Sequence, residues 1–255
     1  MISIQHVSKI YEPAGSKRHA EPGVQALEDV SLEIADGDRF GIIGMSGAGK
    51  STLVRTINLL EPPTEGRIVV DGQDVTDLKG AELRAYRRRV SMIFQNFGLQ
   101  AQKTVLSNVC FPFLAAKGKV TDDDREHALA LLERVGLKEK ASSYPAQLSG
   151  GQQQRVAIAR ALACDPEYIL CDEATSALDP KSTNTILKLL RDINEETGVT
   201  LIVITHSMDV VQKICNNVAV LELGRVVEQG SVADVFGDPQ AEATRVLLGR
   251  VDWDA

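Results

Sequence analysis

The spacing of apolar residues along the chain predicts short strands that alternate with helices. Short apolar runs ending in glycine or polar residues are typical of buried strands, whereas apolar residues every three to four positions indicate helices with one buried face. We expect strands at residues 2–4, 24–34, 40–43, 67–70, 90–94, 168–171, 199–205 and 218–223. We expect helices at residues 51–60, 122–136, 152–163 and 181–197, and a polar helical tail from Ser231. This alternation predicts an α/β core with a largely parallel sheet.

One long stretch breaks the alternation. From about Thr104 to Ala163 the pattern is helical throughout, which indicates a helical subdomain within the α/β core. The clearest helix there, at residues 122–136, has four apolar residues on one side: Ala128, Leu131, Leu132 and Val135. Residues 12–23 are rich in proline, glycine and charge, and they predict a surface loop between two strands.

Composition limits the classes of function. The chain has 255 residues, of which 44% are hydrophobic, enough for one large domain with a sizeable core. Its net charge of −7 argues against a nucleic-acid-binding surface across the protein. We interpret one basic cluster as a solvated helix face, with a phosphate-binding patch as the alternative: Arg84, Arg87, Arg88 and Arg89.

Cysteines and apolar runs suggest where the protein works. The four cysteines lack CxxC spacing, so reduced cytosolic thiols fit them better than disulfides or a metal site. We expect no signal peptide at the start of the chain. The apolar runs are too short to span a bilayer, so any membrane role must come through a partner.

A glycine-rich loop follows the strand at residues 40–43. Gly44 and Gly49 let the backbone curl so that successive N–H groups point at one anion, and the following helix adds its positive end. Lys50 would contact the β- and γ-phosphates, and Ser51 would offer a hydroxyl to Mg²⁺. A chance glycine-rich turn is the alternative, but the strand–loop–helix context favours a phosphate loop. The predicted nucleotide-contacting residues here are Gly44, Met45, Ser46, Gly47, Ala48, Gly49, Lys50, Ser51 and Thr52.

An acidic pair follows the strand at residues 168–171. A carboxylate at the C-terminal end of a central strand lies where α/β sheets bind ligands. Asp172 is predicted to hold Mg²⁺, directly or through water, and Glu173 is placed to polarise an attacking water. Alone, such a pair is usually a surface turn, and only the phosphate loop upstream favours the catalytic interpretation.

A third motif, Leu148-Ser149-Gly150-Gly151-Gln152, precedes the helix predicted at 152–163. Helix N-termini bind anions, yet the chain already has a phosphate site at Lys50. The structural alternative for this motif is a loop with a helix cap. The order of the three motifs resembles the ATP-binding subunit of an ABC transporter. In that family, this signature motif of one subunit closes over the ATP held by the other.

The resemblance implies a fold and further site residues. The fold is a P-loop NTPase core with a mainly parallel sheet, an N-terminal antiparallel β subdomain and a helical subdomain carrying the signature. It implies one ATP-binding domain over residues 1–255, with the helical subdomain at about 96–163. By family position, Gln95 touches Mg²⁺ and senses the membrane partner, His206 contacts the γ-phosphate, Tyr11 stacks on adenine, and Asp179 belongs to a loop crossing the dimer interface. A packing role is the alternative for Tyr11 and a structural one for His206.

Finer features are similar to the ATPases of methionine importers. They lie at residues 44–55, 171–180 and 204–211. The resemblance implies an ATPase that uses Mg²⁺, forms an ATP-dependent homodimer and powers amino-acid uptake, of methionine in particular. Its partners would be integral membrane permease subunits, with a solute-binding protein acting indirectly and no nucleic acid. It would lie on the cytoplasmic face of the cell membrane, as a peripheral protein.

Three alternatives stay open at this point. They are the ATPase of a polar amino-acid importer, the ATPase of an exporter or lipoprotein-extraction system, and, less favoured, a soluble ABC-type ATPase. We expect Phe97, Leu99 and Val105 to form the groove for the permease, with buried packing as the alternative.

Two features depart from the methionine importers. The loop at residues 12–23 is longer than usual. Many such ATPases carry a C-terminal domain that binds methionine, whereas only about thirty residues follow the strand predicted at 218–223 here. We therefore expect a terminal helix that includes Val246, Leu247, Leu248 and Trp253. If the chain is complete and drives methionine uptake, we expect no inhibition by internal methionine through this subunit.

Overall fold

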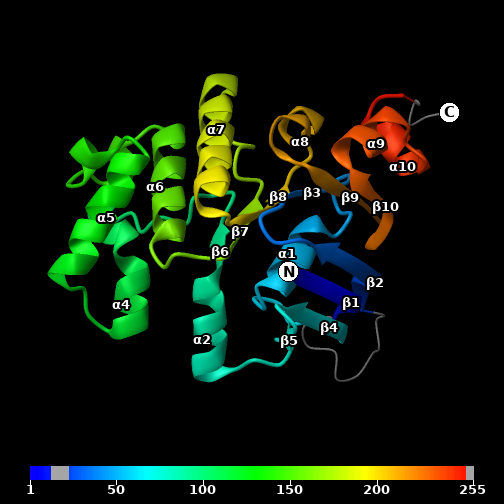
Figure 1. Cartoon of the computed structure of the whole chain (residues 1–255), viewed down its shortest axis with the longest axis horizontal. Coiled ribbons are helices and arrows are strands. Elements are labelled where there is room, and N and C mark those ends of the chain that lie inside the picture. Colours follow the sequence, from blue (N-terminus) through cyan, green and yellow to red (C-terminus); the bar gives the residue numbers. More distant parts are fainter. Residues whose placement is uncertain (13–22, 251–255) are drawn as a thin grey trace. The chain divides into compact units, whose positions relative to one another are not determined.

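The protein is described by a computed structural model that covers residues 1–12 and 23–250 (Figure 1). Its contacts divide the chain into two compact units. The first unit comprises Met1–Lys79 together with the chain from Ile202 onward, and the second unit comprises Gly80–Leu201. Most of the predicted loop at residues 12–23 lies outside the described residues.

The first unit contains an antiparallel sheet with the strand order β2-β1-β4-β5 (Figure 1). Its strands are β1 (Ile2–Tyr11), β2 (Val24–Ile34), β4 (Glu65–Val70) and β5 (Gln73–Asp74). Every second residue toward the end of β2 is buried, because successive side chains of a strand point to opposite faces. Asp71 and Gly72 join β4 to β5 with positive φ angles of 51° and 78°, the conformation that tight hairpin turns require.

The other strands of the first unit are neighbours in the order β10-β9-β3-β8. They are β3 (Arg39–Ile43), β8 (Thr200–Ile204), β9 (Asn217–Glu222) and β10 (Arg225–Ser231), and the boundary between the units falls within β8. Strands β3 and β9 are parallel, whereas β9 and β10 are antiparallel. The helices of this unit are α1 (Lys50–Ile57), α8 (Met208–Ile214), α9 (Val232–Gly237) and α10 (Glu242–Leu247).

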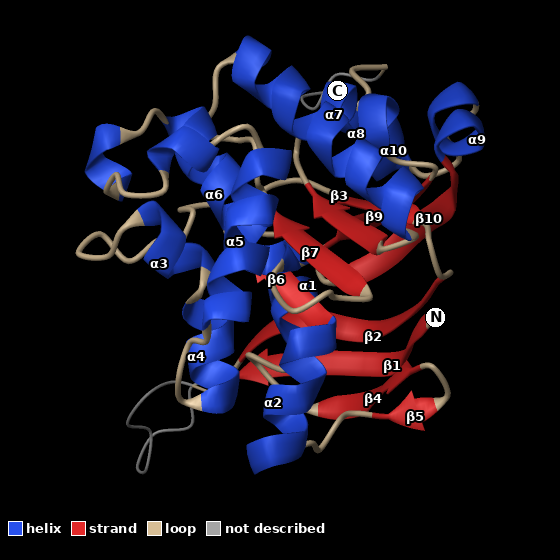
Figure 2. Ribbon diagram, turned by 60° about the vertical axis from the view of Figure 1, so that its left-hand side comes forward, coloured by secondary structure: helices blue, strands red, loops and turns tan. Residues whose placement is uncertain are grey.

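The second unit combines two parallel strands with most of the helices (Figure 2). The strands are β6 (Val90–Ile93) and β7 (Tyr168–Asp172). The helices are α2 (Gly80–Arg89), α3 (Val105–Val109), α4 (Phe111–Lys117), α5 (Asp122–Arg134), α6 (Gly150–Leu162) and α7 (Pro180–Thr197), with short 3₁₀ turns at Lys138–Lys140 and Pro145–Gln147. Strand β7 is buried along its whole length, as expected for a parallel strand covered on both faces.

The predicted periodicity is confirmed where it was clearest. The four residues expected on one side of the helix at 122–136 are all buried: Ala128, Leu131, Leu132 and Val135. The basic cluster lies on α2 and at its end, where Arg89 forms a salt bridge with Glu167. The predicted subdomain limits, 96–163, stay a prediction, since the second unit also includes α2, β6, β7 and α7.

The tail forms helices α9 and α10, and its anchor is a carboxylate on β10. Glu228 accepts hydrogen bonds from the backbone N–H groups of Gln240 and Ala241, and from the hydroxyl of Thr244. Val246, Leu247 and Leu248 are half-buried, and Trp253 lies outside the described residues. In the described chain, no helix is long and apolar enough to cross a membrane.

Helix α5 begins with a charged network around Asp124. The carboxylate accepts a hydrogen bond from the ammonium of Lys117 at 2.7 Å and another from the backbone N–H of Thr121 at 2.9 Å. The hydroxyl of Thr121 in turn accepts the backbone N–H of Asp124, which completes a capping box. These hydrogen bonds, that from Lys117 foremost, lower the pKa of Asp124 to about 2.

The lowered pKa of Asp124 predicts acid sensitivity. A carboxylate whose folded-state pKa lies below its ordinary value stabilises the fold above that ordinary value, and this contribution is lost as the pH falls toward the folded-state pKa. We expect Asp124→Asn to lower the urea midpoint of unfolding at pH 6, with a difference from wild type that shrinks between about pH 4 and pH 2. Asp123→Asn, at the exposed neighbouring position, is the control and should show a smaller effect at pH 6. A constant difference across this pH range would contradict the assignment.

Candidate functional site

Close backbone contacts shape the phosphate loop between β3 and α1. Gly44 has a φ of 154°, and a Cβ atom added there would lie 2.3 Å from the carbonyl oxygen of Leu221. Gly49 has a φ of 99°, and its added Cβ would lie 2.5 Å from the carbonyl oxygen of Ala26. Only glycine fits such contacts, and its freedom at positive φ allows the loop to curl. The curl is therefore built into the packing of the first unit.

Helix α1 begins without a side-chain cap. Its N-cap residue is Gly49, which makes no side-chain hydrogen bond to the first turn. Six other helices of the described chain are capped by side chains, those of Thr104, Thr121, Ser149, Asp179, Ser207 and Ser231. The first N–H groups of a helix have no acceptor within the helix, and an anion is a ready partner for them. The start of α1 is thus suited to bind a phosphate.

Lys50 adds a positive charge to this loop. Its ammonium group donates to the carbonyl oxygens of Gly44, at 2.8 Å, and Met45, at 2.9 Å. The side chain is buried against the loop that it spans. Because these two bonds direct the ammonium across the loop, a phosphate bound at the start of α1 would meet both the N–H groups and this charge.

The other predicted residues of the loop differ in exposure. Met45, Ser46 and Gly47 are exposed at its tip, Ala48 is buried, and Ser51 and Thr52 are half-buried in the first turn of α1.

Tyr11 lies beside the first turn of α1. Its hydroxyl is 3.3 Å from the hydroxyl of Thr52 and donates to the carboxylate of Glu61. The ammonium of Lys9 is 5.4 Å from the centre of the tyrosine ring. His206 belongs to the same unit, where it is exposed and lies two positions after the end of β8. The first unit therefore contains the phosphate loop, Tyr11 and His206.

The second unit brings together Gln95 and Glu173. Strands β6 and β7 are parallel neighbours, so their carboxyl ends lie on one edge. Gln95 follows β6 by two positions, and its amide nitrogen donates to the carboxylate of Glu173 at 3.2 Å and to the hydroxyl of Ser176 at 3.3 Å. Asp172 ends β7 and is buried, whereas Glu173 is half-buried. These are the residues predicted for magnesium and for water.

The backbone of Glu173 is held in an unusual conformation. Its φ is 47°, in the left-handed region that a residue with a Cβ rarely adopts. Its carbonyl oxygen accepts the N–H of Ser176 at 3.1 Å and the hydroxyl of Ser176 at 3.0 Å, which stabilises the turn. Left-handed residues of this kind cluster at functional sites, where the surroundings hold them against the cost.

Cys171 precedes this acidic pair on β7. Burial, and then the charge of Asp172, raises the pKa of the Cys171 thiol to about 12. The thiol is therefore protonated at neutral pH and is a poor metal ligand. The end of β7 offers carboxylate oxygens to a cation.

The signature motif forms a helix cap. The Ser149 hydroxyl accepts the backbone N–H of Gln152 at 3.3 Å, and the Gln152 side chain accepts the N–H of Ser149 at 2.9 Å. A Cβ added to Gly151 would lie 2.9 Å from the hydroxyl oxygen of Ser182, so glycine allows the start of α6 to approach the start of α7. Ser149 therefore caps α6, as the structural alternative supposed. The motif also allows the N-termini of α6 and α7 to lie close together.

Asp179 caps α7 in the same region. Its carboxylate accepts the backbone N–H groups of Lys181 and Ser182, each at 3.0 Å. The hydrogen bond from the Ser182 side chain, followed by that from the Ser182 backbone, lowers the pKa of Asp179. The two helix starts border a cavity of about 320 Å³, whose lining includes Ser149, Gly151, Arg155, Asp179, Lys181 and Ser182. Two helix N-termini and two basic side chains against one carboxylate suit an anionic ligand.

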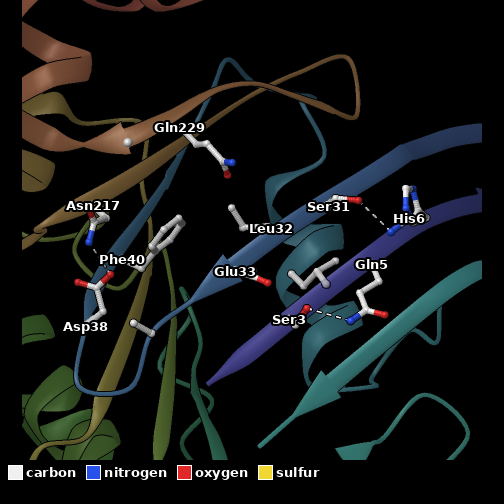
Figure 3. Close-up of a pocket in the computed structure, with 13 residues that line it drawn as sticks. Ser3, Gln5, His6, Ser31, Leu32, Glu33, Asp38, Phe40, Asn217 and Gln229 are labelled. Atoms are coloured by element: carbon white, nitrogen blue, oxygen red, sulfur yellow. Dashed lines mark hydrogen bonds between the residues drawn. The ribbon is translucent and has the colours of Figure 1, made fainter. Parts of the chain in front are cut away.

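A larger cavity, of about 700 Å³, lies in the first unit between β1 and β2 on one side and β9 and β10 on the other (Figure 3). Its described lining includes none of the predicted site residues. Several of its polar groups bond to one another: Asn217 donates to Asp38 at 2.9 Å, and Gln5 donates to Ser3 at 3.1 Å (Figure 3). We do not assign the nucleotide to this cavity, because the phosphate loop does not line it.

The predicted permease groove needs a correction. Val105 is fully buried in α3, so it belongs to the packing of the second unit and not to a contact surface. Phe97 and Leu99 are half-buried. Large apolar side chains that the sequence did not single out are exposed in this unit: Phe94, Phe111 and Leu114. Phe111 and Leu114 lie on the short helix α4, which the sequence pattern did not separate from its neighbours.

Sequence comparison gives a consistent family. The family described as "ABC transporter" matches residues 27–176. Among similar proteins, the methionine import ATP-binding protein of Mannheimia succiniciproducens is 53% identical over 97% of this chain and 70% of its own length. That of Paraburkholderia xenovorans is 54% identical over 98% of this chain and 71% of its own length. This chain thus spans about 70% of the length of these relatives.

Solved structures agree with the fold. A dimeric ATP-binding cassette in a post-hydrolysis state, bound to ADP and Pi, matches with a TM-score of 0.80 and 38% identity over 91% of this chain and 99% of that one. A subunit of a Clostridium perfringens ABC transporter complex matches with a TM-score of 0.80 and 30% identity, over 93% of this chain and 90% of that one. These similarities confirm the predicted fold class. The chain belongs to the ABC transporter family, and within it to the methionine import ATP-binding proteins.

Proposed function

We propose that this chain is the ATP-hydrolysing subunit of a methionine importer and acts on the cytoplasmic face of the membrane through a permease. The observation that carries the proposal is the phosphate loop, in which Lys50 spans the uncapped start of α1. The choice of methionine rests on the relatives, which are methionine import proteins. They do not favour a polar amino-acid importer, an exporter or a soluble ATPase.

Magnesium fits the donor groups that are present. Ser51 offers a hydroxyl, Asp172 a buried carboxylate, and Gln95 an amide oxygen whose NH₂ group already donates to Glu173. Mg²⁺ prefers such oxygen ligands and usually binds one or two protein groups together with substrate phosphates. When bound, Mg²⁺ would neutralise charge on the β- and γ-phosphates. Ser51, Asp172 and Gln95 are the residues proposed to hold it.

Glu173 is proposed to act on the attacking water. Its carboxylate accepts a hydrogen bond from water and so directs an oxygen lone pair toward the γ-phosphorus. The bond from Gln95 and the fixed backbone at Glu173 restrict the directions in which the carboxylate can point. His206 is proposed to contact the γ-phosphate, and Tyr11 to stack on adenine. Because phosphoryl transfer depends mainly on positioning and charge stabilisation, these contacts account for hydrolysis.

A second copy of the chain completes the proposed machine. The cavity between the starts of α6 and α7 has anion-binding features, while the phosphate loop supplies the chain's own ATP site. We therefore assign Ser149, Gly150, Gly151, Gln152 and Asp179 to the ATP held by a second subunit. The similar cassette structure with ADP and Pi is dimeric, which supports this assignment.

The exposed apolar residues of the second unit are proposed to contact the permease. Phe94 directly precedes Gln95, so a partner bound there would lie beside a proposed catalytic residue. Phe111 and Leu114, exposed on α4 of the same unit, are proposed as further contacts. A solute-binding protein would act on the permease and so only indirectly on this subunit. No nucleic-acid partner is proposed, given the net charge of −7.

Replacing the proposed catalytic carboxylate should separate binding from hydrolysis. We expect Glu173→Gln to bind Mg-ATP but to hydrolyse it about 10²–10⁴-fold more slowly, because the amide keeps the shape and loses the charge that polarises water. The mutant should accumulate as an ATP-bound dimer in size-exclusion chromatography. Glu126→Gln, on the exposed side of α5, is the control and should keep its turnover. Near wild-type turnover in Glu173→Gln would refute the assignment.

Removing the charge from the phosphate loop should weaken ATP binding itself. A hydrogen bond to a charged group contributes about 1.5–3 kcal/mol, so Lys50→Ala should raise the Kd for ATP by about 10–100-fold. Equilibrium titration with fluorescent ATP measures this. Lys188→Ala removes a surface ammonium that pairs with Asp192, and it should leave the Kd unchanged. An unchanged Kd in Lys50→Ala would place the lysine outside the site.

Filling the cavity at the signature motif should prevent dimer formation. We expect Ser149→Arg to bind ATP as a monomer but to lose the ATP-dependent dimer in a Glu173→Gln background, because the long side chain takes the space of the partner's γ-phosphate. The substitution also removes the cap of α6, which costs about 1 kcal/mol. Ser231→Arg removes a serine cap from α9 in the same way and is the control. A dimer that persists in Ser149→Arg would contradict the proposed second-subunit site.

A further inference from the structure

The chain turns sharply just after Gln95. Phe97 and Gly98 both have left-handed backbones, with φ angles of 57° and 59°, and the N–H of Gly98 donates to the carbonyl oxygen of Asn96 at 2.5 Å. The left-handed region suits glycine but is unfavourable for phenylalanine. This turn, residues 96–98, is therefore held in place by its surroundings and not by local preference.

Arg160, in the last turn of α6, holds the turn. Its guanidinium donates to the carbonyl oxygen of Phe97 at 2.8 Å and to that of Gly98 at 2.6 Å. The two carbonyl oxygens lie within reach of one planar guanidinium, and each accepts from a different one of its terminal nitrogens. Within the described chain, Arg160 has no carboxylate partner.

The geometry of the guanidinium makes this contact specific. Arg160 is half-buried, and burial lowers the pKa of its guanidinium. The bond to Phe97 is partly buried and the bond to Gly98 is exposed, so water is excluded from only part of the contact. A lysine cannot replace this contact, because its ammonium lacks the planar fork that matches two adjacent acceptors.

Gln154, on the same helix, adds a second observation. It is fully buried, and neither its amide nitrogen nor its amide oxygen has a partner in the described chain. A Cβ added to Gly150 would lie 3.8 Å from the ring of Phe97, and Gln154 shares the helix face of Gly150 because it is four residues further on. Buried amides without partners are rare and unfavourable. A shift of the turn toward α6 would offer this amide the peptide groups that it lacks.

We infer that Arg160 is a positioning residue for Gln95 and that α6 connects it to the signature motif. Helix α6 has 13 residues, so it is about 20 Å long and carries Ser149 at its start and Arg160 near its end. A displacement of α6, when its start engages the partner's ATP, would move Arg160, the turn and therefore Gln95. This inference rests on the proposed roles of Gln95 and of the dimer. It makes one subunit's signature motif a control on that subunit's own catalytic residues.

The first test measures the turn without nucleotide. Hydrogen–deuterium exchange at residues 95–99 should be faster in Arg160→Lys than in wild type. Arg134→Lys is the matched control, because it makes the same change in the same unit at a guanidinium that pairs with Glu196. It should leave exchange at residues 95–99 unchanged. Equal exchange in the two variants would overturn the positioning role, whether or not the protein hydrolyses ATP.

The second test measures the connection to the signature motif. In a Glu173→Gln background, ATP should drive dimer formation and change the exchange at residues 95–99. With Arg160→Lys added, the dimer should still form, but this change should be lost. In the single variant Arg160→Lys, kcat should fall about 10–100-fold with an unchanged KM for ATP, the result expected when a catalytic group is misplaced. If wild-type protein neither dimerises nor hydrolyses ATP, the proposed function fails, while the exchange without nucleotide still decides the role of Arg160.

Gln154→Met provides a test if Arg160→Lys does not fold. Methionine has a similar size and needs no hydrogen bonds, so this variant should have a higher urea midpoint than wild type. It should also reduce the ATP-driven change at residues 95–99 in the Glu173→Gln background, because the shifted turn loses its partner. A wild-type response in Gln154→Met, together with a lowered urea midpoint, would show that the Gln154 amide has hydrogen-bond partners in this arrangement. It would overturn the inference that the turn shifts toward α6.

Discussion

Backbone N–H groups at the start of α1 impose the main constraint on the first unit. They need an acceptor, yet Gly49 supplies no side chain to cap them. The loop can leave them open to a phosphate only because β3 leads into a curl that passes close to the carbonyl oxygens of Leu221 and Ala26. Those oxygens belong to β9 and β2, which lie in different sheets of the first unit. The packing of both sheets thus determines the shape of the phosphate loop.

The second unit meets the same constraint in the opposite way. The starts of α6 and α7 are capped by Ser149 and Asp179, so these helices are stable without a ligand. An anion at this cavity would add to the caps or compete with them, and the contribution of a neutral cap is only about 1 kcal/mol. A highly charged phosphate is therefore a better competitor than a neutral ligand. The uncapped start of α1 is suited to hold the phosphates of the chain's own ATP. The capped start of α6 is suited to contact the phosphates of an ATP that another subunit holds.

The sequence predicts features whose causes are local. A glycine pattern between a strand and a helix indicates the phosphate loop, and a 3.6-residue period indicates the buried face of α5. Features that depend on distant contacts are not predicted. The bond between Arg160 and the turn joins residues 62 and 63 positions apart, and no local pattern indicates it. Val105 has the same apolar character as a surface contact residue, and only its burial excludes that role.

The site roles themselves follow from combining residues that are ambiguous one by one. Gln95 is an ordinary polar residue until the parallel pairing of β6 and β7 brings it to Glu173. Asp179 is a helix cap by its own hydrogen bonds, and the cavity that it shares with Ser149 supports the second role that the family resemblance implies. Neither pairing follows from sequence order, because strand neighbours and helix starts meet through the tertiary fold.

Within the second unit, the position of the proposed catalytic carboxylate, that of Glu173, is determined from two directions. Ser176 binds the carbonyl oxygen of Glu173 and holds its left-handed backbone, while Gln95 binds the carboxylate. Gln95 in turn leads into a turn in which Phe97 has an unfavourable conformation and its carbonyl oxygen accepts a hydrogen bond from Arg160. Because the first support is local and the second passes through α6, a movement of α6 would alter the direction of the carboxylate and leave its backbone in place. An arrangement of this kind can switch hydrolysis on and off without rebuilding the site.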